Sequence, residues 1–297
     1  MLEKDFYQID VFTDTPLRGN PAAVVFDAED IPAPVMQAIA REMNLSETVF
    51  VLAPSSPGAD YRVRIFSPGS EFPFAGHPTL ATAYAVLKRG GLFPEGRPPG
   101  VLRQECGIGI VPVRVEGPEP VLTMTQGRPE YHPAKVSRSL LADMLGCALD
   151  ELAPGPIEVV STGLPWLIGE VADRRVISSL KPDLGLIAKV CTDLVTPGIT
   201  VFCENPEGSA ARLRLRTFAP VVGVAEDPVC GSGNGCVAAY LARHRHGDRT
   251  SFAYTAEQGV EIGRHGLVHV AGTRAGETWS IEVGGTAVKV LEGRISF

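Results

Sequence analysis

The sequence lacks any apolar run that approaches the ~18 residues needed to cross a membrane. Its first residues, Met-Leu-Glu-Lys-Asp-Phe, also lack the basic and then apolar profile of a secretion signal. We therefore expect a cytoplasmic protein that does not enter a membrane. Hydrophobic content of 44% and charged content of 21% are typical of a globular protein, and 297 residues suit two domains that each bury a core.

Basic clusters are scarce, which argues against a nucleic-acid partner. The chain carries 34 acidic and 27 basic residues, a formal net charge of −7. The one basic stretch, 243–249, follows an apolar helix-like segment, where cations suit the negative end of a helix dipole.

Cysteines are few and scattered, with no CxxC pair and no histidine at the spacing of a zinc ligand. Without an export signal they are expected to be reduced thiols, and we expect no metal site. The six cysteines are Cys106, Cys147, Cys191, Cys203, Cys230 and Cys236.

The stretch from Glu226 to Leu241 has the pattern of a glycine-rich loop that enters an apolar helix. The first N–H groups of a helix have no partner within the helix, and the dipole adds partial positive charge there. The stretch therefore predicts an anion site with Asp227, Cys230 and Ser232 beside it. The plain alternative is a turn that only caps a helix.

A second copy of this pattern favours the functional interpretation. Residues 62–68 (Arg-Val-Arg-Ile-Phe-Ser-Pro) match residues 214–220 (Arg-Leu-Arg-Thr-Phe-Ala-Pro) at an offset of 152. The helix starts at Gly76 and Gly231 match at an offset of 155, so the loop before them carries a three-residue insertion. We interpret this as a duplicated domain and expect the two helix starts to face each other across a cleft.

The periodicity of apolar residues predicts a mixed chain of strands and helices. The segment 127–133 breaks both periods and predicts a linker, while the Pro- and Gly-rich 94–100 predicts a surface loop. Expected helices are 33–43, 78–89, 137–146, 183–191 and 230–246. Expected strands are 6–12, 24–26, 48–52, 61–66, two within 101–126, and 157–161, 251–255, 260–263, 267–271, 278–283 and 286–297.

Glu47 stands at the mouth of the strand 48–52, where the second repeat has Ile199. Such a carboxylate is ordinarily a solvated loop charge. Its presence in only one repeat favours a chemical role, since an acid required by the fold itself would be expected in both repeats.

Four short motifs occur in order along the chain: Gly-Asn-Pro at 19–21, Asn-Leu-Ser-Glu-Thr at 44–48, Pro-Phe-Ala-Gly-His-Pro at 73–78 and Glu-Asp-Pro-Val-Cys-Gly-Ser at 226–232. Together they resemble the phenazine biosynthesis PhzF-like isomerase family, over nearly the whole chain. The resemblance implies the α+β diaminopimelate epimerase fold, with two pseudo-symmetric halves that are each a curled, mostly antiparallel sheet around a central helix. The halves would be 1–127, joined by the returning last strand 286–297, and 128–285, with the active-site cleft between them.

The resemblance also implies roles for individual residues and a cofactor-independent reaction on a small molecule. Glu47 would be the general acid/base, with His77 and Asp227 as further catalytic residues. The expected enzyme is a homodimeric isomerase that moves a proton between carbons of a small carboxylated metabolite, amino-acid-derived or cyclic. Substrate binding would fall to Asn20, Ser46, Gly76, Cys230, Gly231 and Ser232.

Cys230 departs from the best-known family pattern, which has threonine there. Related two-cysteine racemases carry a cysteine at this position and another before the first Gly, where this chain has Ala75. A helix start should lower the thiol pKa and Asp227 should oppose that, so we expect a moderately reactive thiol that packs against substrate. Two alternatives stay open: an amino-acid epimerase or racemase using Cys230 with Glu47, and a non-catalytic small-molecule binding protein.

Overall fold

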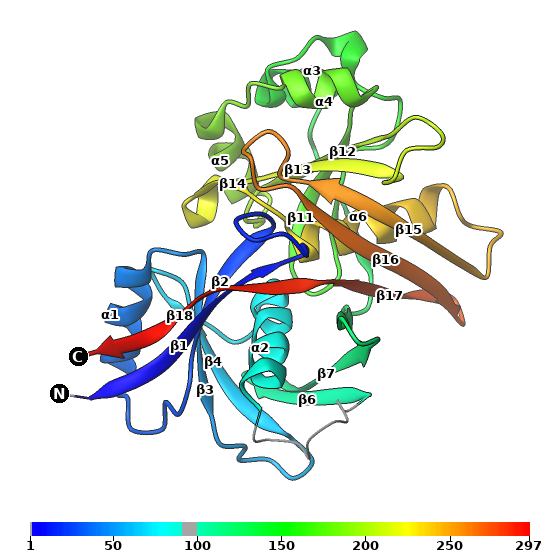
Figure 1. Ribbon diagram of the computed structural model, residues 1–297. Coiled ribbons are helices and arrows are strands. Elements are labelled where there is room, and N and C mark those ends of the chain that lie inside the picture. Colours follow the sequence, from blue (N-terminus) through cyan, green and yellow to red (C-terminus); the bar gives the residue numbers. More distant parts are fainter. Residues whose placement is uncertain (1, 91–99) are drawn as a thin grey trace. The chain divides into compact units, whose positions relative to one another are not determined.

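The computed structural model describes residues 2–90 and 100–297, so all but the last residue of the expected 94–100 loop lies outside the described residues. The chain forms two compact units (Figure 1). Unit 1 comprises Met1–Met124 and Gly284–Phe297, and unit 2 comprises Thr125–Val283.

Unit 1 is a mostly antiparallel sheet in the order β18–β1–β2–β3–β4–β6–β7–β8. Of these pairs among the described residues, β2–β3 and β4–β6 are parallel, and β5 pairs antiparallel with the last two residues of β4. Its helices are α1 (Ala33–Met43) and α2 (Gly76–Arg89). Its strands are β1 (Glu3–Val11), β2 (Asn20–Val25), β3 (Glu47–Leu52), β4 (Tyr61–Phe66), β5 (Glu71–Phe72), β6 (Val101–Cys106), β7 (Gly109–Glu116), β8 (Val121–Thr125) and β18 (Ala287–Ser296).

Helix α2 is the central helix of unit 1 and is buried on every side from His77 to Val86. It packs against β1, β2, β3, β6, β7 and β18 (Figure 1). Small residues such as Ala81, Ala83 and Ala85 let the surrounding strands approach closely, as expected for a helix that is apolar all round. The helix begins at Gly76, two residues before its predicted start.

Unit 2 repeats this plan around α6, which packs against β10, β11, β12 and β16. Its strands pair in the order β9–β10–β11–β12–β13–β15–β16. Its helices are α3 (Arg138–Leu145), α4 (Arg174–Ser179), α5 (Leu184–Asp193) and α6 (Gly231–His244), with short 3-10 turns at Leu149–Glu151 and Pro220–Val222. Its strands are β9 (Glu130–Pro133), β10 (Glu158–Ser161), β11 (Pro165–Glu170), β12 (Ile199–Glu204), β13 (Leu213–Ala219), β14 (Val224–Asp227), β15 (Ser251–Gln258), β16 (Gly266–Ala275) and β17 (Thr278–Gly285).

The strand pairings confirm the duplication read from the sequence. The parallel pair β2–β3 has its counterpart in β11–β12, and the antiparallel pair β3–β4 in β12–β13. The parallel pair β4–β6 likewise matches β13–β15, and in each unit the central helix lies between these two strands in the chain. The fold is the α+β architecture expected, with two similar units each built on a curled sheet and a central helix.

Three predictions of local structure are wrong. The segment 101–126 holds three strands, because the chain turns at Gly107 and reaches Gly109 with φ of +107°, a conformation that favours glycine. The predicted linker contains β9, an edge strand whose last residue, Pro133, needs no ladder donor. The segment 260–263 is a turn and not a strand, closed by a hydrogen bond from Arg264 N to Gly259 O.

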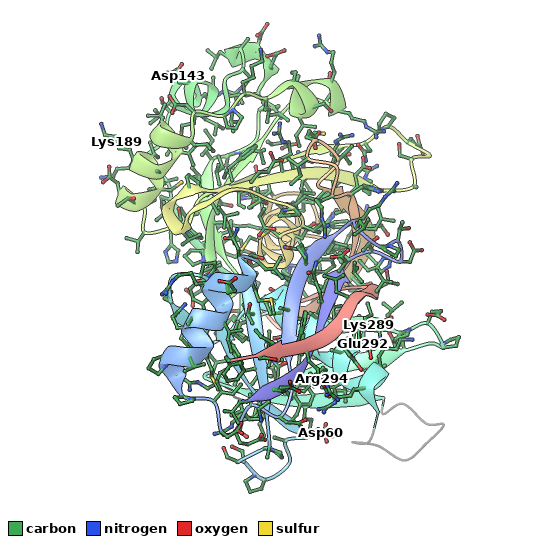
Figure 2. All side chains as sticks on the ribbon, turned by 60° about the vertical axis from the view of Figure 1, so that its left-hand side comes forward. Asp60, Asp143, Lys189, Lys289, Glu292 and Arg294 are labelled. Atoms are coloured by element: carbon green, nitrogen blue, oxygen red, sulfur yellow. The ribbon has the colours of Figure 1, made fainter. Side chains whose placement is uncertain are left out.

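The returning strand β18 lies beside β1 and pairs with it through backbone hydrogen bonds (Figure 2). An ion pair also joins the two strands. Arg294 Nε lies 3.3 Å from Asp5 Oδ1 on β1, and Lys289 forms an ion pair with Glu292 along β18 itself. These charges are on the solvent side and contribute little stability each. Among the described residues, no helix is long and apolar enough to span a membrane.

Candidate active site

Glu47 is placed at the mouth of β3 by the way α1 ends. Asn44 adopts the left-handed conformation (φ 51°) that terminates α1, and three residues later the chain enters the sheet. Glu47 then lies beside Ala22 of the parallel strand β2. Asn20, the buried first residue of β2, lies two residues before Ala22, at the same end of the sheet.

The Glu47 carboxyl is withdrawn from water and faces the imidazole of His77. Its Oε2 lies 3.3 Å from His77 Nε2, and the two side chains are 17% and 8% exposed respectively. Burial raises the pKa of Glu47 to about 7, and the Ser46 hydroxyl opposes part of that rise. A carboxyl with this pKa is present in both its acid and its base form near neutral pH.

The N-terminus of α2 completes this cluster in unit 1. His77 is the second residue of the helix, and Gly76 is the first. A Cβ built at Gly76 would meet no atom within 4 Å, so space lies open in front of the first helical turn. The N–H groups of that turn have no partner within the helix and carry the positive end of its dipole.

Unit 2 carries the second predicted helix start, capped by Cys230. The Cys230 sulfur accepts a hydrogen bond from Gly233 N at 3.3 Å, and the residue is 4% exposed. Burial raises the pKa of the Cys230 thiol well above its usual value, and the Asp227 carboxylate raises it further. The opposing effect expected of Asp227 is found, and the Gly233 N–H does lower the pKa, but the expected moderately reactive thiol is wrong because desolvation of the thiolate outweighs the helix start.

Ser232 lies on the first turn of α6 and contacts two side chains. Its Oγ accepts a hydrogen bond from Trp166 Nε1 at 2.9 Å and lies 3.4 Å from Cys230 Sγ. Gly233, the next residue, allows this turn to approach the sheet, since a Cβ there would lie 2.6 Å from Thr200 Oγ1. Sequence reasoning missed Trp166, whose partner is 66 residues away along the chain.

Asp227 ends β14, and a buried glutamine fixes the loop that joins it to α6. Gln258 Nε2 donates to the Asp227 carbonyl at 2.9 Å, while Gln258 Oε1 accepts from Cys230 N at 3.2 Å and from Asn234 Nδ2 at 3.1 Å. The Asp227 carboxylate itself accepts from Val229 N at 3.1 Å. Gln258 therefore connects both ends of the loop, a role that no sequence motif signalled.

Strand β14 is also held by a two-point ion pair. Arg216 Nε and Nη2 each donate to the Glu226 carboxylate at 2.8 Å, and Glu226 directly precedes Asp227. The repeat places the same pair in unit 1, where Arg64 donates to Glu71 at 2.7 Å through the same two nitrogens. The arginines are 152 residues apart and the glutamates 155, the two offsets found in the sequence.

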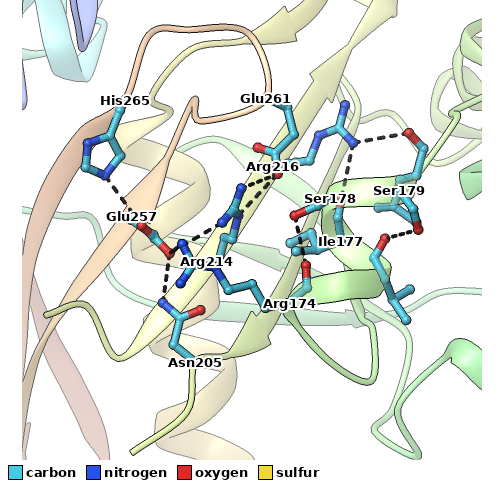
Figure 3. A network of polar contacts seen from close by, with 12 residues as sticks. Arg174, Ile177, Ser178, Ser179, Asn205, Arg214, Arg216, Glu257, Glu261 and His265 are labelled. Atoms are coloured by element: carbon cyan, nitrogen blue, oxygen red, sulfur yellow. Dashed lines mark hydrogen bonds and ion pairs between the residues drawn. The ribbon is translucent and has the colours of Figure 1, made fainter. Parts of the chain in front are cut away.

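A further polar network lies alongside Arg216 in unit 2 (Figure 3). Glu257 accepts from Asn205 Nδ2 at 3.0 Å and lies 3.8 Å from Arg214 Nη1 and 3.5 Å from His265 Nε2. Arg214 in turn donates to Glu261 at 2.6 Å. These groups pair with one another and hold the 259–265 turn against β13, which indicates a structural role.

Neither cluster has the donors of a metal centre. Among residues 2–90 and 100–297, no group of three or more His, Cys, Asp or Glu side chains could hold a metal ion. The structure brings Ser46, Glu47, Gly76 and His77 together in unit 1, and Asp227, Cys230, Gly231 and Ser232 together in unit 2. The first group holds a buried carboxyl beside an imidazole, and the second holds a hydroxyl, a thiol and a carboxyl at a helix start.

A known structure of low sequence identity shows the fold first. A probable proline racemase from Agrobacterium radiobacter has a TM-score of 0.64 at 15% identity, covering 99% of this chain and 93% of that one. This likeness shows the fold, which is that of the epimerases and racemases with two similar units.

The family follows from nearer relatives. A structure of the Bacillus anthracis phenazine biosynthesis protein of the PhzF family has a TM-score of 0.92 at 32% identity, covering all of both chains. The trans-2,3-dihydro-3-hydroxyanthranilate isomerase of Pseudomonas aeruginosa is 37% identical over 296 residues, 96% of this chain and 97% of the relative. The family model described as phenazine biosynthesis-like protein matches residues 9–293. The chain therefore belongs to the phenazine biosynthesis-like (PhzF) family and is an enzyme of the isomerase type, as the sequence motifs predicted.

Proposed function

We propose that this isomerase moves a proton between carbons of a small carboxylated metabolite, amino-acid-derived or cyclic, with Glu47 as its general acid/base and without a cofactor. The observation that carries the proposal is the buried Glu47 carboxyl, with a pKa of about 7, lying 3.3 Å from His77 at the start of α2.

The chemistry requires one group that removes a proton from carbon and returns it to another carbon. Such a group works best when its pKa is close to the working pH, because both protonation states are then accessible. An ordinary glutamate near 4.5 would be a weak base and almost never an acid at neutral pH. Burial of Glu47 removes that limitation.

The neighbours of Glu47 suit the charge that develops when the proton leaves. Removing a proton from carbon places negative charge on the substrate, and fixed N–H and imidazole donors stabilise it without reorganising. We assign this role to His77 and to the backbone at Gly76. Asn20 and Ser46 are proposed to bind the substrate at the same end of the unit 1 sheet.

The start of α6 in unit 2 is proposed to bind an acidic group of a substrate. The N–H groups at Gly231 and the hydroxyl of Ser232 are donors at a helix start, a common anion-binding arrangement. Asp227 is proposed as the further catalytic residue, and Cys230 is proposed to line the site. We also expect the enzyme to form a homodimer, which light scattering of the purified chain measures.

The reaction of the Pseudomonas aeruginosa relative suggests where to look for a substrate. By its name that enzyme acts on trans-2,3-dihydro-3-hydroxyanthranilate, a cyclic amino acid. This compound is the first to assay, followed by other cyclic β-amino carboxylates, because members of one fold and motif share reaction type more than substrate.

The test is incorporation of solvent deuterium into a turned-over substrate. We expect Glu47→Gln to remain folded and to lose about 10²- to 10⁴-fold in exchange rate, the usual contribution of a positioned acid/base. Glu42→Gln, on the exposed end of α1, is the matched control and should exchange at the native rate.

Three outcomes would contradict the proposal. Near-native exchange by Glu47→Gln would remove Glu47 from the mechanism. Tight binding of a metabolite with no exchange in the native enzyme would favour a binding protein instead. Exchange at the α-carbon of an amino acid with inversion of configuration would support the epimerase alternative.

A further inference from the structure

Ser232 has an unusual set of partners for a residue proposed to bind the substrate. Its Oγ accepts a hydrogen bond from Trp166 Nε1 at 2.9 Å. An indole N–H can only donate, so this contact occupies one lone pair of the hydroxyl and leaves its hydrogen unused. Trp166 is 3% exposed on β11, so the donor is fixed by packing.

Cys230 presents a second group to the same oxygen. Its sulfur lies 3.4 Å from Ser232 Oγ and already accepts a hydrogen bond from Gly233 N. Either atom of this contact can be the donor. Burial and Asp227 keep the thiol protonated, so its S–H has a hydrogen that it can donate to Ser232 Oγ. With the thiol as donor, the Ser232 oxygen accepts from both sides.

We propose that Trp166 and Cys230 are positioning residues that fill both acceptor sites of Ser232, so that its hydroxyl hydrogen is donated to an acceptor-only group of the substrate. The proposal rests on the proposed function, in which Ser232 binds the substrate's acidic group. A hydroxyl has one hydrogen and two lone pairs, so two fixed donors determine what it offers to a ligand. The group that meets Ser232 must therefore offer a lone pair, as the oxygen of a carboxylate or another oxyanion does, and an ammonium or amide N–H is disfavoured.

This arrangement also accounts for the residue at position 230. A threonine there would carry one hydroxyl hydrogen and could donate to Ser232 as the thiol does. Alanine has no hydrogen to donate. The role assigned to Cys230 is thus to supply a hydrogen bond and not to exchange protons with substrate carbon.

The chain offers a clean way to observe this contact. It has only two tryptophans, Trp166 and Trp279, so the indole region of a ¹H–¹⁵N spectrum contains two signals. Trp279 is 5% exposed on β17 and packs against Phe252 and Arg274. The indole signal that disappears in Trp279→Phe belongs to Trp279. Sulfate is the probe, because at neutral pH it accepts hydrogen bonds and has none to donate.

The experiment titrates the full chain with sulfate and follows both indole signals together with the backbone amide signals of the first turn of α6. In the native protein we expect the Trp166 signal to move on binding and the Trp279 signal to stay. Trp166→Phe should weaken sulfate binding about three- to tenfold, the range for an oriented hydrogen bond. Trp279→Phe should bind like the native protein.

A double-mutant cycle separates positioning from packing. If Trp166 acts through Ser232, Trp166→Phe should cost nothing further in a Ser232→Ala background. Cys230→Ser should bind sulfate like the native protein, and Cys230→Ala should bind it more weakly. The proposal would be overturned if Trp166→Phe lowered the sulfate affinity equally in the native and Ser232→Ala backgrounds. It would also be overturned if Cys230→Ala bound sulfate as tightly as the native protein does.

The proposal can still be tested if Trp166→Phe fails to fold, because the Trp166 signal can be compared between native protein and Ser232→Ala. A Trp166 signal that moves equally with sulfate in both proteins would overturn it. Its failure is also distinct from failure of the proposed isomerase. Sulfate binding requires no turnover, whereas loss of deuterium exchange in Glu47→Gln tests the chemistry alone.

Discussion

Oε2 of Glu47 lies 3.3 Å from Nε2 of His77, although one residue begins a strand and the other lies in the first turn of a helix. Both side chains are largely withdrawn from solvent, at 17% and 8% exposure, and burial is what raises the pKa of the Glu47 carboxyl. This is the pair to which we assign the proposed proton transfer, and the first two predictions concern it.

The rate of the reaction should follow the ionisation of Glu47. Burial raises the pKa of this carboxyl to about 7, so the carboxylate is the minor form below that pH. If the reaction starts by proton abstraction, kcat/KM should rise about tenfold per pH unit below pH 7 and level off above it. A pH–rate profile on the turned-over substrate measures this. A flat profile from pH 5.5 to 8 would exclude Glu47 as the base.

Glu47 should also make the protein less stable as the pH rises. The folded-state pKa of about 7 exceeds the ordinary value of 4.5, so the native state binds the proton more tightly than the unfolded chain does. Stability is then lost between about pH 4.5 and pH 7, by about 3 kcal/mol at most, since each pKa unit corresponds to ~1.4 kcal/mol.

Glu47→Gln, which imitates the neutral acid, removes that loss. Urea unfolding at about pH 4.5, 6 and 8 measures the free energy of unfolding of both proteins. The value for Glu47→Gln should increase relative to that of the native protein as the pH rises. Glu42→Gln on exposed α1 should show no such trend. Parallel pH dependence of native protein and Glu47→Gln would contradict the assigned pKa.

Much of the fold and one part of the site follow from the sequence because the signals are local. Glu47 and His77 belong to short motifs, and the repeat at 152 residues predicted two similar units. Trp166 and Gln258 could not be found this way, since their contacts with Ser232 and Asp227 span 66 and 31 residues and depend on the folded sheet.

The reversed prediction for Cys230 has a different physical origin. A helix start lowers a thiol pKa only when the thiolate remains hydrated or paired, and here burial dominates. Burial of a single residue in a glycine-rich loop is set by what packs over it. The same limit applies to 107–109, where alternating apolar residues continue through a tight turn and hide it.

Cys230→Thr should be mild if Cys230 only positions Ser232. Threonine keeps a hydrogen to donate and approximates the volume of cysteine. Deuterium exchange should remain within a few-fold of native, an energy change of about 1 kcal/mol or less. Loss of exchange at one stereochemical face in a folded Cys230→Thr would identify the thiol as a base and favour the epimerase mechanism.

Val195 should be a site where a smaller residue stabilises the protein. It follows α5 with φ of 56° and is 83% exposed, and its N–H and that of Thr196 close the helix end onto Thr192 and Cys191. Glycine ordinarily occupies this position, because a left-handed conformation is costly for a β-branched residue.

Val195→Gly should therefore raise the free energy of unfolding by about 1 kcal/mol, even though glycine gains more entropy in the unfolded chain. Val222→Gly is the matched control, because Val222 is also exposed, at 54%, but has an ordinary backbone conformation. The free energy of unfolding of this variant should fall or stay unchanged. Equal effects of the two changes in urea unfolding would refute the strain at Val195.

The two repeated ion pairs should differ in strength because they differ in burial. Arg216 and Glu226 are 7% and 13% exposed, whereas Arg64 and Glu71 are 32% and 42% exposed. Arg216 also donates to the carbonyl oxygens of Ile177 and Leu180 at the end of α4, so its guanidinium cannot turn to water when its partner changes.

Glu226→Gln keeps the shape of the side chain but leaves a buried guanidinium without its countercharge. It should lower the free energy of unfolding by about 2–4 kcal/mol, somewhat below the full cost of breaking a buried pair because the amide oxygen still accepts. Glu71→Gln, its counterpart in unit 1, should cost about 1 kcal/mol or less, as exposed pairs do. Urea unfolding of the two variants at neutral pH measures both. If both variants lowered the free energy of unfolding by similar amounts, the repeated geometry, and not burial, would determine how much each ion pair stabilises the protein.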